Sequence, residues 1–236
     1  MKAMSQRIID LTLTISDNMP VQSTFQRPVY VTLQTHESSR QFGAGTEDDP
    51  HTSSWKYLGL VEHTGTHVDA FFHMNPNGAT VDEMPISMFF GKAVCFDMTH
   101  IPDLGEIQVA DLEAAQEKTG ITVDGHIVLL NTGFHRRHFP NQELFDINPG
   151  LSPEATHWLA DHGSMVHGVE GPSTDIMSTN LFPSHRVCRD RGITHYEWLV
   201  NLEEVVGKGE FIFYGVPLRL DKGTGSPVRA FAVIED

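Results

Sequence analysis

Three histidines and one aspartate lie within eleven residues of the sequence, in the stretch HTGTHVDAFFH at positions 63–73. They are His63, His67, Asp69 and His73. Imidazole nitrogens and carboxylate oxygens are preferred ligands of Zn²⁺ and Mn²⁺, and no cysteine lies nearby to suggest a structural zinc held by thiolates. The residue types therefore predict an exposed metal site that keeps a coordination position for water.

The spacing of these residues requires a bend in the chain. On a straight strand, at about 3.3 Å per residue, His63 and His67 would lie roughly 13 Å apart. Because nitrogens that bind one ion lie about 2.1 Å from it, the chain must turn between them, and Gly65 is the residue able to turn it. Thr66 and Asp69 also resemble the start of a capped helix, but we favour metal binding for the aspartate.

The cluster resembles the signature H-x-G-T-H-x-D-x-P-x-H of the metal-dependent cyclase family, which includes bacterial kynurenine formamidases and isatin hydrolases. The resemblance implies that His63, His67 and Asp69 bind metal and that His73 donates and accepts protons. The sequence has Phe71 where the signature has proline, so the backbone angle before His73 is not fixed by a ring.

A second block, FPSHRVCRDRGITHYEWLVNLEEV, resembles the part of the family that completes the metal site. The resemblance implies that His185 and Glu197, twelve residues apart, are further ligands. His195 competes with His185 on residue type alone, but its spacing from Glu197 does not match. Members of the family bind one or two divalent ions. We expect Zn²⁺ or Mn²⁺ here, and the sequence leaves open whether one ion or two are bound.

Strands and helices alternate around these two blocks. Hydrophobic periodicity predicts strands at residues 9–15, 30–35, 92–98, 126–131, 165–169, 211–218 and 228–234. Helices are predicted at residues 109–118, from Ser152 and Pro153 to Gly163, at 185–191 and at 196–206. The fold class is therefore α/β (mixed α+β), and the resemblance implies a single domain, residues 1–236, of the cyclase-like swivelling β/α type with a central, mostly buried sheet.

The polar segment 36–54 interrupts this pattern and is predicted to be a lid or a subunit arm, with surface disorder as the alternative. The resemblance implies a homodimer or homotetramer. Candidate residues for the substrate pocket are Gln22, Trp55, Phe71 and Phe72, together with Phe89 and Phe90. Gln22 stands where the formamidases carry a tryptophan, which weakens a kynurenine assignment, and His51 joins Trp55 as a lid candidate.

Composition excludes several classes of function. The 236 residues include 16 Lys and Arg against 31 Asp and Glu, a net charge of −15, which argues against nucleic acid and anionic membranes as partners. No apolar run approaches the roughly 20 residues of a membrane span. The two cysteines form no C-x-x-C pair, which fits a reducing, cytoplasmic setting. The chain also lacks the G-x-S-x-G of serine hydrolases and any phosphate-binding loop.

These observations predict a metal-dependent hydrolase that acts on a small molecule. A metal-activated water, with His73 as acid and base, would cleave the C–N bond of a cyclic amide, a lactam or an N-acyl aromatic amine. The enzyme class would be an amidohydrolase similar to arylformamidase or isatin hydrolase. The alternatives are hydrolysis of a cyclic ester or a ketone-derived ring, and a member of the family that binds metal or ligand without catalysis.

Overall fold

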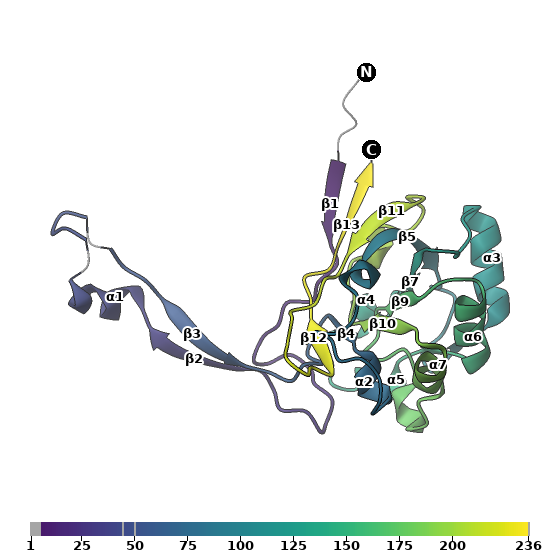
Figure 1. Ribbon diagram of the computed structural model, residues 1–236, viewed down its shortest axis with the longest axis horizontal. Helices are drawn as coiled ribbons and strands as arrows, with labels where there is room; N and C mark the ends of the chain where they lie inside the picture. Colours follow the sequence, from purple (N-terminus) through teal and green to yellow (C-terminus); the bar gives the residue numbers. More distant parts are fainter. Residues whose placement is uncertain (1–5, 44, 50, 236) are drawn as a thin grey trace, which may run out of the picture. The chain divides into compact units, whose positions relative to one another are not determined.

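The structure is a computed structural model that describes residues 6–43, 45–49 and 51–235 (Figure 1). The chain forms two compact units. The larger unit contains residues 6–14 and 62–235 of those described, and the smaller unit contains residues 15–61. All residues of both motifs lie in the larger unit.

Nine strands of the described chain form one sheet in the larger unit, in the order β1-β13-β11-β5-β7-β9-β10-β4-β12. The four central strands β5, β7, β9 and β10 run parallel, and the strands on both sides of them are antiparallel to their neighbours. This confirms the mixed α/β fold with a central sheet. The strands are β1 (Gln6–Asp10), β4 (His67–Asp69), β5 (Phe90–Asp97), β7 (Ile127–Asn131), β9 (Val166–Val169), β10 (Thr194–Glu197), β11 (Phe211–Tyr214), β12 (Gly225–Pro227) and β13 (Phe231–Glu235).

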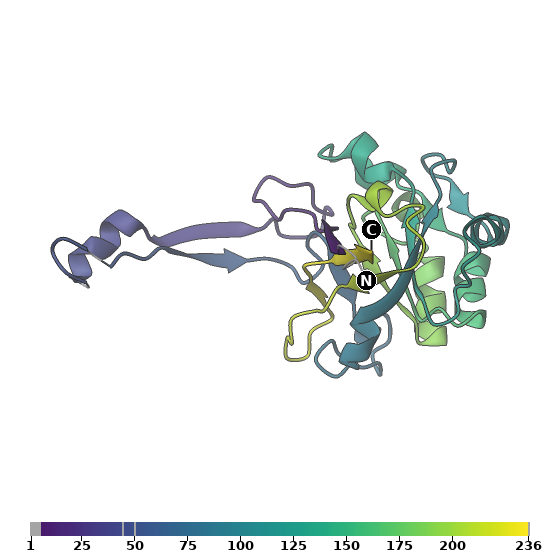
Figure 2. The same ribbon diagram turned by 90° about the horizontal axis from the view of Figure 1, so that it is seen from above.

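The longer helices α3, α6 and α7 lie on one face of this sheet (Figures 1 and 2). Ser152 accepts a hydrogen bond from the Ala155 amide at the start of α6, as predicted, and Gly120 closes α3 in the left-handed conformation. No helix in the described part of the chain combines the length and the apolar character needed to span a bilayer. The helices are α2 (Phe71–Met74), α3 (Val109–Thr119), α4 (Phe134–His138), α5 (Leu144–Ile147), α6 (Pro153–Asp161) and α7 (Pro183–Arg191), with 3-10 turns at Ile86–Phe89, Met177–Thr179 and Leu202–Glu204 and a small ladder of β6 (Glu106–Ile107) with β8 (Gly150–Leu151).

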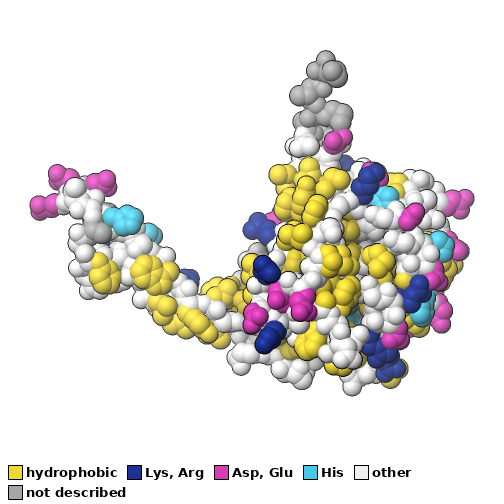
Figure 3. Space-filling view, viewed as in Figure 1, with side chains coloured by type: hydrophobic (Ala, Val, Ile, Leu, Met, Phe, Trp, Pro, Cys, Tyr) yellow, Lys and Arg dark blue, Asp and Glu magenta, His cyan; other side chains and the backbone are white. Residues whose placement is uncertain are grey.

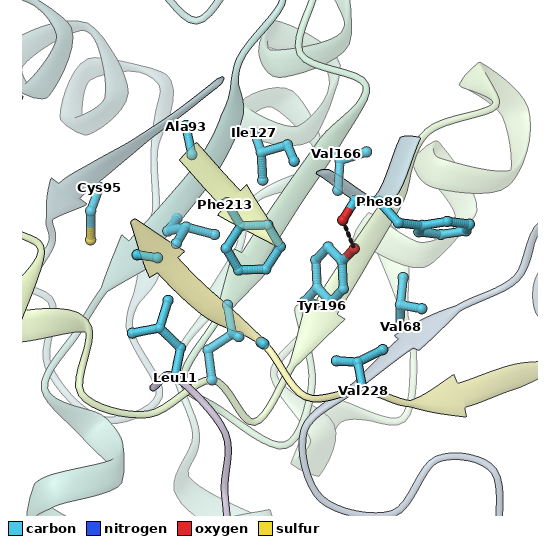
Figure 4. Close-up of a cluster of buried hydrophobic side chains, with 14 of the residues drawn as sticks. Leu11, Val68, Phe89, Ala93, Cys95, Ile127, Val166, Tyr196, Phe213 and Val228 are labelled. Atoms are coloured by element: carbon cyan, nitrogen blue, oxygen red, sulfur yellow. Dashed lines mark hydrogen bonds between the residues drawn. The ribbon is translucent and has the colours of Figure 1, made fainter. Parts of the chain in front are cut away.

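The central strands are apolar on both faces because each face is covered. Alternate residues of β5 and β7 enter two separate buried clusters, one against the antiparallel strands and the other beneath α3 and α6. Figure 4 shows the first cluster, where Ala93, Cys95 and Ile127 lie with Tyr196 and Phe213. The Tyr196 hydroxyl donates to the Gly215 carbonyl at 2.9 Å, which ties β10 into this core.

The helix predicted at residues 196–206 is wrong. Residues 194–197 form strand β10, which pairs with β9 on one side and with β4 on the other. Trp198 and Asn201 then take positive φ values of 58° and 57°, which an α-helix does not contain. Pairing on both sides overrides the local preference, so Glu197 is a strand residue rather than a helix carboxylate.

The smaller unit is built around an antiparallel hairpin of β2 (Val29–Gln34) and β3 (Trp55–Gly59). The predicted polar segment 36–54 connects the two strands and contains α1 (His36–Ser39) and a 3-10 turn at Arg40–Phe42. Thr35 and Ser38 form a capping box at the start of α1. Two residues of the segment, Ala44 and Pro50, lie outside the described residues.

Candidate metal centre

Strands β4 and β10 bring the two sequence blocks together on one face of the sheet. Their antiparallel register pairs His67 with Glu197 and Val68 with Tyr196. Because successive side chains of a strand point to opposite faces, Val68 and Tyr196 enter the apolar core while His67 and Glu197 face away from it. The long-range pairing of two short strands therefore creates the centre.

The bend predicted at Gly65 is confirmed by a φ of +64° there. The turn places the rings of His63 and His67 at right angles, with centroids 5.0 Å apart. Thr66 does not cap a helix: its hydroxyl donates to the Trp198 carbonyl and accepts a hydrogen bond from the Leu13 amide. Strand β4 follows directly, and the first helical turn after it, α2, carries His73.

The carboxylate of Asp69 lies between two sets of imidazoles. Its Oδ1 atom is 2.8 Å from Nδ1 of His63 and 3.4 Å from Nε2 of His67. Its Oδ2 atom is 3.7 Å from Nε2 of His185 and 3.4 Å from Nε2 of His195. Asp69 is only 3% exposed, so bulk water does not separate these groups.

Glu197 spans the same two sets. Its Oε2 atom is 3.5 Å from Nε2 of His67, and its Oε1 atom is 3.7 Å from Nε2 of His185 and 3.2 Å from Nε2 of His195. The structure thus brings together all five residues predicted as ligands: His63, His67, Asp69, His185 and Glu197.

Hydrogen bonds on the far side of each ring orient the imidazoles. Nδ1 of His67 lies 2.8 Å from the Gly65 carbonyl, and Nδ1 of His185 lies 2.5 Å from a carboxylate oxygen of Asp175. A proton on each Nδ1 leaves Nε2 with a lone pair that faces the carboxylates, which is the arrangement of metal-binding histidines. Nε2 of His67 is buried and has no hydrogen-bond partner in the described chain. An ion would satisfy this atom, so the donor set fits a divalent metal.

His63 is oriented by a longer chain of contacts. Its Nε2 lies 2.9 Å from the Thr224 hydroxyl, which donates to Glu62 at 2.6 Å. The Thr224 hydroxyl gives its own proton to Glu62, so it accepts from Nε2 of His63, and Nδ1 is the ring nitrogen that faces Asp69, at the distance of a hydrogen bond. Burial lowers the pKa of His63, but Asp69 raises it above its usual value, so a bound ion would take the place of the Nδ1 proton.

The charges of the cluster shift its pKa values. Burial by itself raises the pKa of Asp69, but the surrounding imidazoles, His63 first, hold it well below its usual range. Burial lowers the pKa of His73, so its imidazole is neutral near pH 7 and able to accept a proton. His73 lies 3.7 Å from Asp69, and its side chain is 32% exposed, far more than the others of the cluster.

The predicted pocket residues divide between the two units. Phe71 and Phe72 lie on α2; Phe71 packs against the core and also lines a cavity of about 10 Å³ with Asp69 and His195, while Phe72 is exposed. Phe89 is buried in the core and lines a separate cavity with Met84 and Leu218, so its role in a substrate pocket stays a prediction. Gln22 and Trp55 belong to the smaller unit, and their role in the pocket stays a prediction.

His195, which the sequence offers only as an alternative to His185, lies inside the cluster. Ligand atoms of Asp69, His185, His195 and Glu197 lie within 4.8 Å of one another. The signal was present in the sequence: in a strand, His195 and Glu197 share one face. The helix predicted from residue 196 hides this relation, because Glu197 would then not share a strand with His195.

Replacing Gly225 with alanine is expected to disturb His63. Gly225 pairs with Asp69 across β12 and β4, and a Cβ there would lie 2.8 Å from the ring of His63 and 2.9 Å from the Val68 carbonyl. Because the backbone carbonyl cannot move aside cheaply, the imidazole must shift, and we expect metal affinity to fall about 10- to 100-fold, as when a ligand loses its support.

Metal titration of the purified variant measures this effect. Gly168→Ala is the matched control, because its Cβ would crowd only side chains of the core, chiefly Leu199 and Leu129. An affinity unchanged in Gly225→Ala and in the control would show that His63 does not depend on this close approach.

Comparison with known proteins identifies a matching family model, similar sequences and similar folds. The family model described as "Putative cyclase" matches residues 9–176. Kynurenine formamidase from Salinibacter ruber is 30% identical over 188 residues, which cover 79% of this chain and 83% of that protein. An isatin hydrolase bound to the product analogue thioisatinate has a similar fold, with a TM-score of 0.84 at 21% identity, over 98% of this chain and 93% of that one. Isatin hydrolase A from Labrenzia aggregata also has a similar fold. Its TM-score is 0.80 at 25% identity, over 98% of this chain and 94% of that one.

Proposed function

Because this chain belongs to the cyclase family, we propose that it is a metal-dependent hydrolase that cleaves the C–N bond of a small amide. The observation that carries the proposal is the buried pair Asp69 and Glu197, enclosed by imidazoles whose lone pairs face the two carboxylates. A solvated loop or an ordinary ion-pair network would not bury two acids among so many imidazoles.

A divalent ion bound in this centre lowers the pKa of a water molecule and polarises a carbonyl oxygen. His63, His67 and Asp69 would hold one ion, and Asp69, His185 and Glu197 would hold a second. His73, neutral and partly exposed, takes a proton from the attacking water and returns it to the leaving nitrogen. Since His73 is the exposed member of the cluster, the substrate approaches from its side.

We propose a cyclic amide, a lactam or an N-acyl aromatic amine as the substrate. The names of the relatives, kynurenine formamidase and isatin hydrolase, support this choice. The second candidate is a cyclic ester or ketone-derived ring, because the same water and the same acid and base would open it. A member that binds metal or ligand without turnover is the non-catalytic alternative.

The test combines metal analysis with a substrate screen. The purified protein is analysed for Zn²⁺ and Mn²⁺, and assayed with lactams, cyclic imides, N-formyl anilines and lactones before and after chelation. We expect turnover of an amide that is lost on chelation and restored by one of the two ions. Activity that survives complete metal removal would overturn the proposal, and turnover of lactones alone would favour the ester alternative.

We further propose that the hairpin of β2 and β3 is a subunit arm in a homodimer or homotetramer. A two-stranded hairpin with apolar side chains is marginally stable in water by itself. This hairpin exposes a set of apolar side chains along both strands, and Figure 3 shows apolar side chains gathered on this unit. The exposed residues are Val29, Tyr30, Val31, Leu33, Trp55, Tyr57 and Leu58. A second copy of the chain is the partner that supplies a matching surface in every molecule.

Deleting residues 40–50 is expected to raise the Michaelis constant by about tenfold, the effect of losing about 1.4 kcal/mol of substrate binding. The deletion removes the tip of the predicted lid or arm and leaves both strands of the hairpin in place. Steady-state kinetics measure the effect, and the molar mass in solution separates the two roles: a lid changes kinetics alone, whereas an arm also changes assembly. Unchanged kinetics and unchanged mass would refute both.

A cytoplasmic location is likewise a proposal, supported by Cys95 and Cys188, which are both free and buried. The acidic composition supports a small-molecule substrate over nucleic acid or a membrane surface as the partner.

A further inference from the structure

His195 lies at the centre of a row of side chains that crosses three strands. On β9 its register partner is His167, and the register of β10 with β4 places it beside Asp69. The imidazole is 1% exposed, and its ring is T-shaped to that of His185 with centroids 4.7 Å apart. It therefore faces the carboxylates together with a residue that the motif predicts as a ligand.

The ring nitrogens of His195 lack the hydrogen bonds that a buried imidazole requires. Nε2 is 3.4 Å from Asp69 and 3.2 Å from Glu197, but neither ring nitrogen has a hydrogen-bond partner of good geometry in the described residues. Buried polar atoms are nearly always paired, so the unpaired Nε2 that faces the two carboxylates calls for a missing partner.

The spacing of the four donor groups fits an ion better than hydrogen bonds. Atoms held about 2.0–2.2 Å from one ion in a tetrahedral arrangement lie roughly 3.3–3.6 Å apart. The nitrogens of His185 and His195 lie 3.2–3.7 Å from the facing oxygens of Asp69 and Glu197. Hydrogen bonds between nitrogen and oxygen are shorter, about 2.7–3.2 Å.

We infer that His195 is a fourth protein ligand, with Asp69, His185 and Glu197, of the second metal position. Four protein ligands close a zinc site, whereas three ligands leave a position for water and substrate. The second position is therefore closed, and the first, held by His63, His67 and Asp69 beside the exposed His73, is the open one. This inference rests on the proposed metal-dependent function.

A neighbouring set of donors offers a different location for an ion. Ligand atoms of His167, Cys188 and His195 also lie within 4.8 Å of one another. However, Nε2 of His167 is already 2.8 Å from the Thr174 hydroxyl, and this set offers one thiol as its anionic ligand where the other offers two carboxylates. The set with Asp69 and Glu197 is the better site for a divalent cation.

Metal stoichiometry and affinity test the inference without any assay of turnover. The intact protein and the variants His195→Ala, His195→Gln, His167→Gln and Cys188→Ser are loaded with Zn²⁺, dialysed and analysed, and Co²⁺-loaded samples are compared by their visible spectra. His195→Gln keeps hydrogen-bonding capacity but is a poor ligand, so it separates a ligand from a residue that only pairs with the carboxylates. His167→Gln is the matched control, since it changes an equally buried neighbour of the same type. Thermal unfolding confirms that each variant folds.

We expect two ions in the intact protein and in the His167 and Cys188 variants. Loss of a residue that only supports a metal ligand lowers metal affinity about 10- to 100-fold. Both His195 variants should lower the affinity for the second ion by at least this factor, because they remove a ligand itself. They should also lose the share of the visible Co²⁺ absorption that the second position contributes, while the share of the first position remains. Two ions of unchanged affinity in His195→Gln, or fewer than two in the intact protein, would overturn the inference. Loss of an ion in the His167 or Cys188 variant would place that ion in the neighbouring set and would overturn the inference as well.

The proposed function can fail separately. If the expected pattern of metal binding appears but no amide is hydrolysed, the proposed function fails and the ligand assignment stands.

Discussion

Replacing Asp69 with asparagine is expected to empty both metal positions and to lower turnover roughly a thousandfold or more. The two carboxylate oxygens of Asp69 face different histidines: Oδ1 faces His63 and His67, and Oδ2 faces His185 and His195. An amide of the same shape carries no charge to balance an ion and offers only one oxygen. The variant should therefore lose the several kcal/mol of transition-state stabilisation that bound metal contributes.

Metal analysis after dialysis and the turnover number measure this effect together. Asp10→Asn is the matched control, because Asp10 pairs with Arg229 at the surface and touches no part of the centre. We expect the control to keep its ions and its activity. An Asp69→Asn variant that retains two ions would show that the carboxylate does not bridge the two positions.

Replacing His73 with alanine is expected to lower turnover by about 100-fold or more while the metal content stays intact. General acid–base catalysis contributes about 10²–10⁴-fold, and the neutral imidazole of His73 is the group of the centre that is open to solvent. The variant keeps every residue that we propose as a ligand, so it should separate proton transfer from metal binding.

His73 lies close enough to the centre to be a metal ligand itself. Ligand atoms of His63, Asp69 and His73 lie within 4.8 Å of one another, so His73 is also near enough to bind an ion. If an ion is lost together with activity, His73 is a ligand and its role as acid and base is wrong. His100→Ala is the matched control, since His100 pairs with Asp111 at the surface.

The sequence by itself determined the first half of the centre. His63, His67, Asp69 and His73 lie so close along the chain that one bend at Gly65 and one helical turn assemble them, and residue types and spacing predict the bend. The resemblance to the cyclase family then supplied His185 and Glu197, which the fold brings to the same place. Local signals also predicted α3 and α6, because their end residues act within a few positions of the chain.

Only the tertiary structure decided how β10 contributes. Locally, residues 196–206 resemble a helix, and on a helix His195 and Glu197 would point in different directions. Pairing with β9 and β4, strands distant in sequence, makes residues 194–197 extended and turns both side chains toward Asp69. The closed second position that we infer therefore depends on long-range hydrogen bonds between strands, which no local pattern encodes. For the same reason, the separation of residues 15–61 into a unit of their own emerged only from the contacts of the folded chain.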